Sequence, residues 1–339
     1  MPIFDRLKVY NIKITYTSSM KKRYLFPADY MADPSVHVFN GRVYIYPSHD
    51  WESDNVENDN GDQYIMKDYH VLSTDDIMNG EVIDHGKILD LEDIPWAGRQ
   101  LWDCDVAEKD GKYYLYFPMK DRNDVFHHGV AIADRPEGPF IPQPDPIRGS
   151  YSIDMCVFKD DGEYYMYFGG LWGGQLQRYK DNKALEEPYL PSGKEPSLPS
   201  RVVKLSEDML QFAEEPRPVY VVDENGKTLT ADDPHRFFEA QWVFKKDGKY
   251  YFTYSTGDSH LLCYATSDNR FGPFTYQGVI LTPVVGWTTH HAIIEYKGKW
   301  YLFHHDSVPS GGKSWLRSLK VCELEFDAEG RIKTIEGKD

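Results

Sequence analysis

The sequence predicts an all-β protein that folds as a five-bladed β-propeller. One short phrase recurs five times along the 339 residues, and each copy places a glycine between two runs rich in β-branched and aromatic residues. That arrangement is the strongest local signal for a β-hairpin. Helical periodicity is nearly absent, with short candidates only at residues 182–187 and 206–214. Repeated hairpins without helices favour one closed ring of similar sheets.

The five hairpins follow one another along the whole chain. In order they read NGRVYIYPS at 40–48, DGKYYLYFP at 110–118, DGEYYMYFG at 161–169, DGKYYFTYS at 247–255 and KGKWYLFHH at 297–305. Their turn glycines are separated by 70, 51, 86 and 50 residues. Because a blade of four antiparallel strands needs on the order of 40 to 50 residues, five copies with two long insertions account for the chain.

The largest insertion lies at about residues 181–236. It holds seven prolines, and its turn sequence ENGKT at 224–228 predicts a small hairpin. We interpret the insertion as a decoration within one blade, so residues 1–339 are expected to form a single propeller domain. Two β domains that meet near residue 180 are the alternative.

Charge and hydropathy exclude several classes of partner. The chain has 54 acidic and 38 basic residues, and its formal net charge of −16 repels phosphate backbones and anionic membrane surfaces. No apolar run reaches the roughly 18 residues of a membrane-spanning helix, and residues 1–16 lack the apolar core of a signal peptide. We expect no nucleic-acid or membrane partner, and a cytoplasmic location, or a periplasmic or secreted one if a signal peptide was removed.

The four cysteines are expected to be buried thiols. They are far apart in the sequence and form no CxxC pair, which argues against a disulfide framework or a cysteine zinc site. The residues are Cys104, Cys156, Cys263 and Cys322.

Ionisable residues begin the first strand of every hairpin. In four copies one of them stands eight or nine residues before the turn glycine, and these are Asp33, Asp154, Glu239 and His290. The second copy has two acids, Asp103 and Asp105, eight and six residues before Gly111. If these strands are the innermost of each blade, their starts converge on one mouth of the central channel. Turn formation is the alternative for a single pair such as Asp33-Pro34, but it does not explain aligned acids in four repeats.

Clustered carboxylates at the end of an axial channel suit glycoside hydrolysis. One carboxylic acid protonates the leaving oxygen, and an ionised partner activates water. A third carboxylate nearby raises the pKa of the acid and keeps it protonated near neutral pH. Metal binding is the rival interpretation, because several carboxylates and a histidine could hold a hard cation. It is the weaker one, since the chain contains no DxDxDG loop and no HExxH motif.

At these residues the sequence resembles glycoside hydrolase family 43, whose members are five-bladed β-propeller enzymes that act on xylan and arabinan side chains. The matching segments are MADPSVHVFNGRVYIY at 31–46 for the general-base motif, SIDMCVFKDDGEYYMYF at 152–168 for the Ile-Asp motif and HRFFEAQWVFKKDGKYYFTYS at 235–255 for the Phe-Glu-Ala motif. The resemblance implies that Asp33 is the general base and Glu239 the general acid. It implies that Asp154 orients the acid and raises its pKa.

The fifth repeat carries two further motifs. HHAIIEYKGKWYLFHH at 290–305 is similar to the segment whose histidine lies at the channel axis beside a calcium ion or a water cluster, which implies that role for His290. WLRSLKVCELEF at 315–326 resembles the closing strand whose arginine reaches the sugar, which implies Arg317. The second repeat departs from the family, because WDCD at 102–105 stands where Trp-Ala-Pro-Asp is usual and adds an acid beside the expected aspartate.

Aromatic residues are the compositional anomaly, since Phe, Trp and Tyr make up 15% of the chain. Strand packing explains most of them, but rings near the axis can also stack on sugar faces. The candidate substrate contacts are Trp102, Asp103, Trp172, His49 and Arg317, with Trp51, Trp242 and Trp287 as further candidate rings. The alternatives are inter-blade packing for each tryptophan and a solvated loop histidine for His49.

The resemblance implies an inverting exo-glycosidase that removes a terminal pentose from xylo- or arabino-oligosaccharides, as a β-xylosidase or an α-L-arabinofuranosidase. Asp33 would deprotonate water on one face of the sugar while Glu239 protonates the leaving oxygen on the other. A retaining fructan-type propeller hydrolase is a weak alternative, because its Asn-Asp-Pro-Asn, Arg-Asp-Pro and Glu-Cys signatures are absent. A noncatalytic sugar-binding propeller is the alternative from another class.

Overall fold

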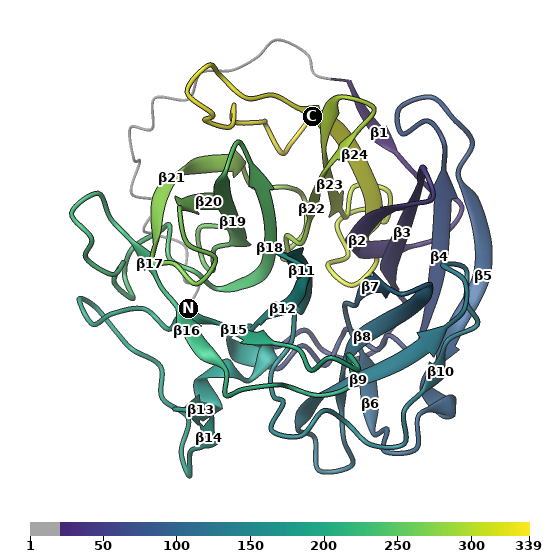
Figure 1. Ribbon diagram of the computed structural model, residues 1–339, viewed down its shortest axis with the longest axis horizontal. Coiled ribbons are helices and arrows are strands. Elements are labelled where there is room, and N and C mark those ends of the chain that lie inside the picture. The colour runs from purple at the N-terminus through teal and green to yellow at the C-terminus, as the bar shows by residue number, and fades with distance from the viewer. Residues whose placement is uncertain (1–20) are drawn as a thin grey trace.

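The structure is a computed structural model that describes residues 21–339 and forms a ring of antiparallel sheets around a central axis (Figure 1). The described residues contain 24 strands and three short 3₁₀ turns, and none of them lies in an α-helix. The all-β, five-bladed propeller predicted from the hairpin repeat is therefore confirmed. Residues 1–16, considered above as a signal peptide, lie outside the described part of the chain.

In the first three blades, the four main strands follow one another in chain order from the axis outward. Blade I consists of β2 (Met31–Phe39), β3 (Arg42–His49), β4 (Asp68–Thr74) and β5 (Ile83–Asp90). Blade II consists of β7 (Asp105–Lys109), β8 (Lys112–Lys120), β9 (Phe126–Ala133) and β10 (Ile141–Pro142), and β6 (Arg99–Leu101) pairs with the end of β8. Blade III consists of β11 (Cys156–Asp160), β12 (Glu163–Phe168), β15 (Ser200–Lys204) and β16 (Arg217–Val219).

The last two blades each include a strand that comes from elsewhere in the chain. Blade IV consists of β18 (Glu239–Lys246), β19 (Lys249–Ser255), β20 (Leu262–Ser267) and β21 (Phe274–Leu281), with β17 (Val221–Val222) added parallel to β21. Blade V consists of β22 (Ala292–Tyr296), β23 (Lys299–Asp306), β24 (Ser318–Leu324) and, as its outer strand, β1 (Lys22–Tyr24). The remaining elements are a hairpin of β13 (Tyr179–Lys180) and β14 (Lys183–Ala184), and the 3₁₀ turns η1 (Leu91–Asp93), η2 (Trp172–Gly174) and η3 (Leu176–Arg178).

The ring closes both at the axis and at its rim. The inner strands β2, β7, β11, β18 and β22 contact one another in that order, and β22 contacts β2 again. At the rim, β1 pairs with β24, so that Arg23 lies opposite Val321 (Figure 1). A segment near the start of the chain thus completes the blade formed by its end.

The five inner hairpins share one turn geometry. In blade I the turn residues Asn40 and Gly41 have φ angles of 52° and 79°, and Phe39 pairs with Arg42 across the turn. The other four hairpins also turn through two residues with positive φ, the first of which is an aspartate or, in blade V, a lysine. Positive φ at both positions defines the type I′ turn, whose twist matches that of the paired strands. The hairpins predicted from the repeated glycine are confirmed.

The insertion at 181–236 contributes strands to two blades. It lies between the inner hairpins of blades III and IV, supplies β15, β16 and β17, and forms a turn at 223–227 flanked by a bridge between Val222 and Thr228. The short helical candidates are wrong, because 182–187 contains β14 and 206–214 is a series of turns. In the latter segment the Ser206 and Asp208 side chains accept hydrogen bonds from nearby backbone N–H groups, which competes with helix formation.

The aromatic residues mainly pack the blades together. Tyr46, Tyr69, Tyr116 and Phe117 are fully buried in the sheets, as strand packing predicts. All four cysteines are free and buried, which confirms the expected thiols. No helix among residues 21–339 is long and apolar enough to cross a membrane. The cytoplasmic location stays a prediction.

Candidate active site

A pocket of about 270 Å³ lies where the inner strands begin, near the lower end of the size range of small-molecule sites. All five strand-start positions reach it. Its ionisable lining residues include Asp33, Asp103, Asp154, Glu239, His290 and Arg317. Its aromatic lining residues are Tyr64, Trp102, Trp172, Phe238 and Trp287. The strand starts therefore converge on one pocket, as the spacing of the repeats predicts, although Asp33 and His290 are more than 250 residues apart in the sequence.

Backbone distortions aim the acidic side chains into the pocket. Strand β2 shifts register between Ala32 and Ser35, and β18 shifts between Glu239 and Trp242. Asp33 and Ala240 lie within these bulges with φ angles of 46° and 59°, and Asp154 has a φ of 60°. Such conformations are costly for residues with a Cβ, and bulges redirect side chains beside functional sites. Strained backbone therefore accompanies the acids at the starts of these strands.

Arg317 fixes the Asp33 carboxylate. Its Nη1 donates to Asp33 Oδ1 at 2.7 Å, while its Nε and Nη2 donate to the two oxygens of Asp50 at 2.9 and 2.7 Å. The Arg317 backbone N–H also donates to Asp50, at 2.8 Å. All three side chains are buried. Asp50 therefore holds the Arg317 guanidinium in one orientation, in which its Nη1 is directed at the Asp33 carboxylate.

Asp33 is kept ionised. Burial raises the pKa of Asp33, but the Arg317 guanidinium and a hydrogen bond from His290 outweigh it and hold that pKa well below its usual range. His305 adds a neutral contact, because burial lowers its pKa to about 3. Its Nδ1 accepts the Asp33 backbone N–H at 3.1 Å, and its Nε2 faces the carbonyl of Thr288 at 3.0 Å. This pair of contacts fixes the tautomer of His305 and the backbone of Asp33.

Glu239 is driven toward the opposite state. Burial raises the pKa of Glu239 well above its usual range, and the negative charges of Asp154 and Asp33 raise it further. A glycine makes room for it, since a Cβ at Gly170 would lie 3.3 Å from the Glu239 Cβ and 2.7 Å from Ile153. The pocket thus contains one carboxyl group that favours its ionised form and another that favours its protonated form.

Asp154 connects the acidic residues to the bulge of β18. Its Oδ2 accepts the backbone N–H of Ala240 at 2.7 Å, and its backbone carbonyl accepts the side-chain amide of Gln241. Asp103 Oδ1 in turn accepts the Asp154 N–H at 3.3 Å. Burial and the charge of Asp154 raise the pKa of Asp103 well above its usual range. Asp154 therefore fixes the backbone of Ala240, the residue next to Glu239, and its charge raises the pKa of the Glu239 carboxyl group.

The two acids of the second repeat have separate environments. Asp103 lines the pocket, whereas Asp105 is absent from the lining. The Asp105 carboxylate instead accepts hydrogen bonds from Ser35 of blade I and from the backbone N–H of Val157 in blade III, and contacts His37 Nε2 at 2.6 Å. Asp105 joins three inner strands around the axis. The acid that the family motif leads one to expect at this position is therefore structural, and the additional acid faces the pocket.

The predicted substrate contacts are divided between the pocket and its surroundings. Trp102, Asp103, Trp172 and Arg317 line the pocket, as does Trp287, whose ring stacks on Trp172 at 5.9 Å between centroids. His49 is not among the lining residues; its ring lies against Asp68 and Asp29 instead. Trp242 is buried and its Nε1–H donates to the Ile293 carbonyl, which is inter-blade packing. Trp51 is 41% exposed and lies outside the lining.

Sequence reasoning missed three residues that organise the site. Asp50 and His305 hold Arg317 and Asp33, and the Arg317 guanidinium lies over the Tyr64 ring, 5.1 Å from its centroid. Asp50 follows directly on β3, the second strand of the first hairpin, so its place at a strand end was the available signal. Nothing comparable marks Tyr64, which lies in a long loop between β3 and β4.

The fold and the pocket define a class of protein: a five-bladed propeller with several buried carboxyl groups gathered in a pocket at one end of its channel. Residues 30–332 match glycosyl hydrolases family 43, and the chain belongs to that family. It is a glycoside hydrolase. The resemblance inferred from the motifs is confirmed.

Three relatives give the comparison its detail. A xylosidase/arabinosidase of Bacteroides ovatus is 72% identical over 94% of this chain and 99% of its own length. The structure of RS223 β-xylosidase has a TM-score of 0.93 at 68% identity, covering 94% of this chain and 99% of that one. CoXyl43, a β-xylosidase/α-arabinofuranosidase from a compost metagenome solved with xylotriose in a calcium-free form, has a TM-score of 0.91 at 56% identity, covering 94% and 98%. These comparisons lend no support to the noncatalytic sugar-binding alternative.

Proposed function

We propose that this chain is an inverting exo-β-xylosidase that also releases α-L-arabinofuranosyl groups, acting on the ends of xylo- and arabino-oligosaccharides. One observation carries the proposal: two carboxyl groups in a single small pocket are driven to opposite protonation states. Arg317 favours ionised Asp33, while burial and acidic neighbours favour protonated Glu239. Acid–base hydrolysis of a glycoside requires a pair of this kind.

In the proposed reaction, Asp33 takes a proton from a water molecule as that water attacks the anomeric carbon. Glu239 gives its proton to the departing oxygen, so the leaving group departs as a neutral alcohol. A single displacement without a covalent intermediate inverts the anomeric configuration. Asp154 acts through Glu239, by holding the neighbouring Ala240 N–H and by opposing ionisation of the acid.

The substrate assignment is supported by the relatives and by the size of the pocket. The relatives are described as xylosidases and arabinosidases, and CoXyl43 was solved with xylotriose. A pocket of about 270 Å³ walled by Trp102 and Trp172 suits the end of a sugar chain better than its middle. The stacked pair of Trp172 and the half-exposed Trp287 offers an apolar face to a sugar ring.

The group of Asp103, Asp154 and His290 bears on calcium. Their candidate ligand atoms lie within 4.8 Å of one another, and Asp103 Oδ2 is buried without a hydrogen-bond partner. The two carboxylates suit Ca²⁺, whereas imidazole is an unusual ligand for it, so water would have to supply the remaining oxygens. We propose that these residues hold calcium, whose charge would lower the pKa values of the neighbouring acids.

Proton NMR of p-nitrophenyl β-xyloside hydrolysis and product analysis of xylotetraose hydrolysis test the reaction. Inversion predicts α-xylose as the first-formed sugar from the xyloside, and exo action predicts xylose with xylotriose, without initial xylobiose, from xylotetraose. Appearance of β-xylose first would contradict the water-activating role of Asp33.

A second experiment tests the calcium proposal. The pH–rate profiles of chelator-treated enzyme are compared with and without added Ca²⁺. Superimposable profiles, together with no metal found by elemental analysis, would reject the proposal.

A further inference from the structure

A second group of polar side chains lies at the same end of blade I but outside the pocket. His49 ends β3 and Asp68 begins β4, and the register that pairs Ser48 with Tyr69 sets these two residues side by side. His70 follows two residues later. Among residues 21–339, only two groups of three His, Cys, Asp or Glu side chains bring their candidate ligand atoms within 4.8 Å of one another. One is this group, and the other is the group of Asp103, Asp154 and His290 in the pocket.

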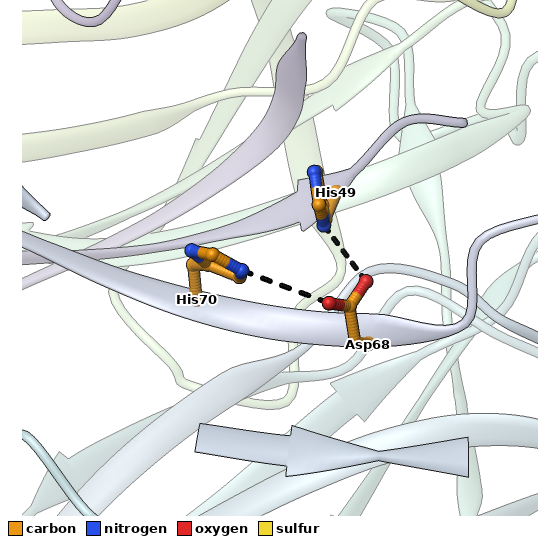
Figure 2. A group of neighbouring side chains, drawn as sticks. All are labelled: His49, Asp68 and His70. Atoms are coloured by element: carbon orange, nitrogen blue, oxygen red, sulfur yellow. Dashed lines mark hydrogen bonds and ion pairs between the residues drawn. The ribbon is translucent and has the colours of Figure 1, made fainter. Parts of the chain in front are cut away.

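Both imidazole rings face the Asp68 carboxylate (Figure 2). His49 Nδ1 lies 2.7 Å from Asp68 Oδ1, and His70 Nε2 lies 3.6 Å from Oδ2. The His49, Asp68 and His70 side chains are only 11%, 7% and 17% exposed. The three side chains are therefore largely shielded from solvent even without a bound ion.

The outer nitrogen of each ring contacts a carboxylate of its own. His49 Nε2 lies 3.2 Å from Asp29, and His70 Nδ1 lies 3.0 Å from Asp84. Metal-bound histidines characteristically donate their other ring N–H to a carboxylate, which fixes the tautomer and the ring orientation. With the outer nitrogens donating in this way, loss of the proton on each inner nitrogen, which metal binding requires, leaves a lone pair that faces the Asp68 carboxylate. A cation between them would satisfy all three groups.

Asp68 is itself held in place. The Trp51 Nε1–H donates to Asp68 Oδ1 at 2.9 Å, so Oδ2 is the oxygen on the His70 side. Three carboxylates, of Asp29, Asp68 and Asp84, surround two imidazoles. This excess of negative charge favours a divalent cation.

We propose that His49, Asp68 and His70 form a binding site for a divalent transition-metal ion, with Zn²⁺ as the best match. Two imidazole nitrogens, one carboxylate oxygen and a water are a common tetrahedral donor set for zinc. Ligands at about 2.1 Å from a tetrahedral ion lie roughly 3.4 Å apart, which small side-chain rotations can reach from these positions. Ca²⁺ and Mg²⁺ prefer oxygen ligands, so this site and the axial group differ in the metal that they select.

Zinc binding to the whole chain tests the proposal. After chelator treatment, calorimetric titration with ZnCl₂ is compared between the wild type and the His49→Ala/His70→Ala double variant, and Co²⁺ absorption reports the ligand geometry. The double variant is expected to lose one equivalent of Zn²⁺ and the tetrahedral Co²⁺ spectrum. His235→Ala is the matched control, because His235 pairs with the single carboxylate of Asp233 and belongs to neither group. His290→Ala identifies any zinc bound at the axis.

Asp84→Asn provides a milder test that leaves all three ligands in place. Loss of the carboxylate behind His70 is expected to weaken Zn²⁺ binding about 10- to 100-fold. If the double variant does not fold, this variant and anomalous diffraction at the zinc edge from wild-type crystals soaked in ZnCl₂ decide the matter. An unchanged Zn²⁺ affinity in Asp84→Asn, no zinc peak between the three residues, or an equivalent that survives the double variant would overturn the proposal.

Discussion

The two ends of the inner hairpins differ sharply although they belong to the same strands. At the turn end, five copies have the same two-residue type I′ turn, and a Cβ on any of the five turn glycines would meet no atom within 4 Å. At the pocket end, three copies carry an aspartate, one a glutamate and one a histidine, and Asp33, Asp154 and Ala240 have strained backbone conformations. The repeat thus specifies a scaffold at one end and leaves the other free to vary.

The turn end of each hairpin contributes to the stability of the fold, whereas the pocket end supplies the groups that can transfer protons. The turn residues are exposed and satisfy local backbone preferences, so each contributes modestly and independently to folding. The pocket residues are buried carboxyl groups whose negative charges repel one another. This arrangement lowers the stability of the folded state, but it shifts pKa values in a way that proton transfer can use. Substitutions of the carboxyl groups at the pocket end should therefore mainly change activity, and substitutions at the turn end should mainly change the free energy of unfolding.

The largest expected effect is on turnover, from Glu239→Gln at the pocket end. Loss of the proton donor should lower kcat on xylobiose about 10²- to 10⁴-fold, because general acid catalysis contributes on that order. The matched control is Glu163→Gln at the start of β12, an exposed turn-end glutamate whose substitution should leave kcat unchanged. Steady-state kinetics of both variants give the answer. Near-wild-type activity of Glu239→Gln would assign the acid to another residue.

The next effect is on stability, from Asp50→Asn. This change removes one of the two carboxylates that share the buried Arg317 guanidinium, and breaking a buried pair typically costs about 3 to 5 kcal/mol of unfolding free energy. Chemical denaturation measures it, with the exposed Asp54→Asn as the control. We also expect kcat/KM to fall, because Arg317 also fixes Asp33. An unfolding free energy equal to that of the control would show that Asp33 alone holds Arg317.

A smaller effect concerns pH, from Asp154→Asn. Activity requires protonated Glu239, so it falls on the alkaline side as pH rises through the pKa of Glu239. Because the charge of Asp154 raises that pKa, its removal should move the alkaline limb of the kcat/KM profile to lower pH. Asp161→Asn, in the turn at the other end of the same hairpin, should leave the profile in place. A shift of the alkaline limb to higher pH would contradict the assigned influence of Asp154.

The smallest effect is expected at the turn end, from Gly111→Ala. Its φ of 75° is unfavourable for a residue with a Cβ, and no neighbouring atom would clash, so the cost should be the backbone strain of about 1 to 2 kcal/mol. Thermal unfolding should show this loss while kcat stays constant. Asp110→Asn is the control, since asparagine tolerates the same turn conformation. A change in kcat would mean that the two ends are coupled.

Local chemistry explains why much of the site could be predicted. A two-residue turn fixes the register of its hairpin, so counting back from each glycine locates the residue at the far end of the strand. That count found Asp33, Asp154, Glu239 and His290, which all line the pocket. The count could not distinguish Asp103 from Asp105, because the irregular backbone before β7 decides which of the two faces the channel.

The sequence by itself determined the five hairpins, the order of the blades and the ionisable residues that begin four of the inner strands, because turn geometry and strand periodicity act over a few residues. Only the tertiary structure decided that Asp50 holds Arg317, that Asp105 joins three blades, and that His49 meets Asp68 and His70 outside the pocket. It also decided that residues 22–24 close the ring against β24. These contacts depend on side-chain directions at bulged strand ends and on segments far apart in the chain, neither of which a local pattern records.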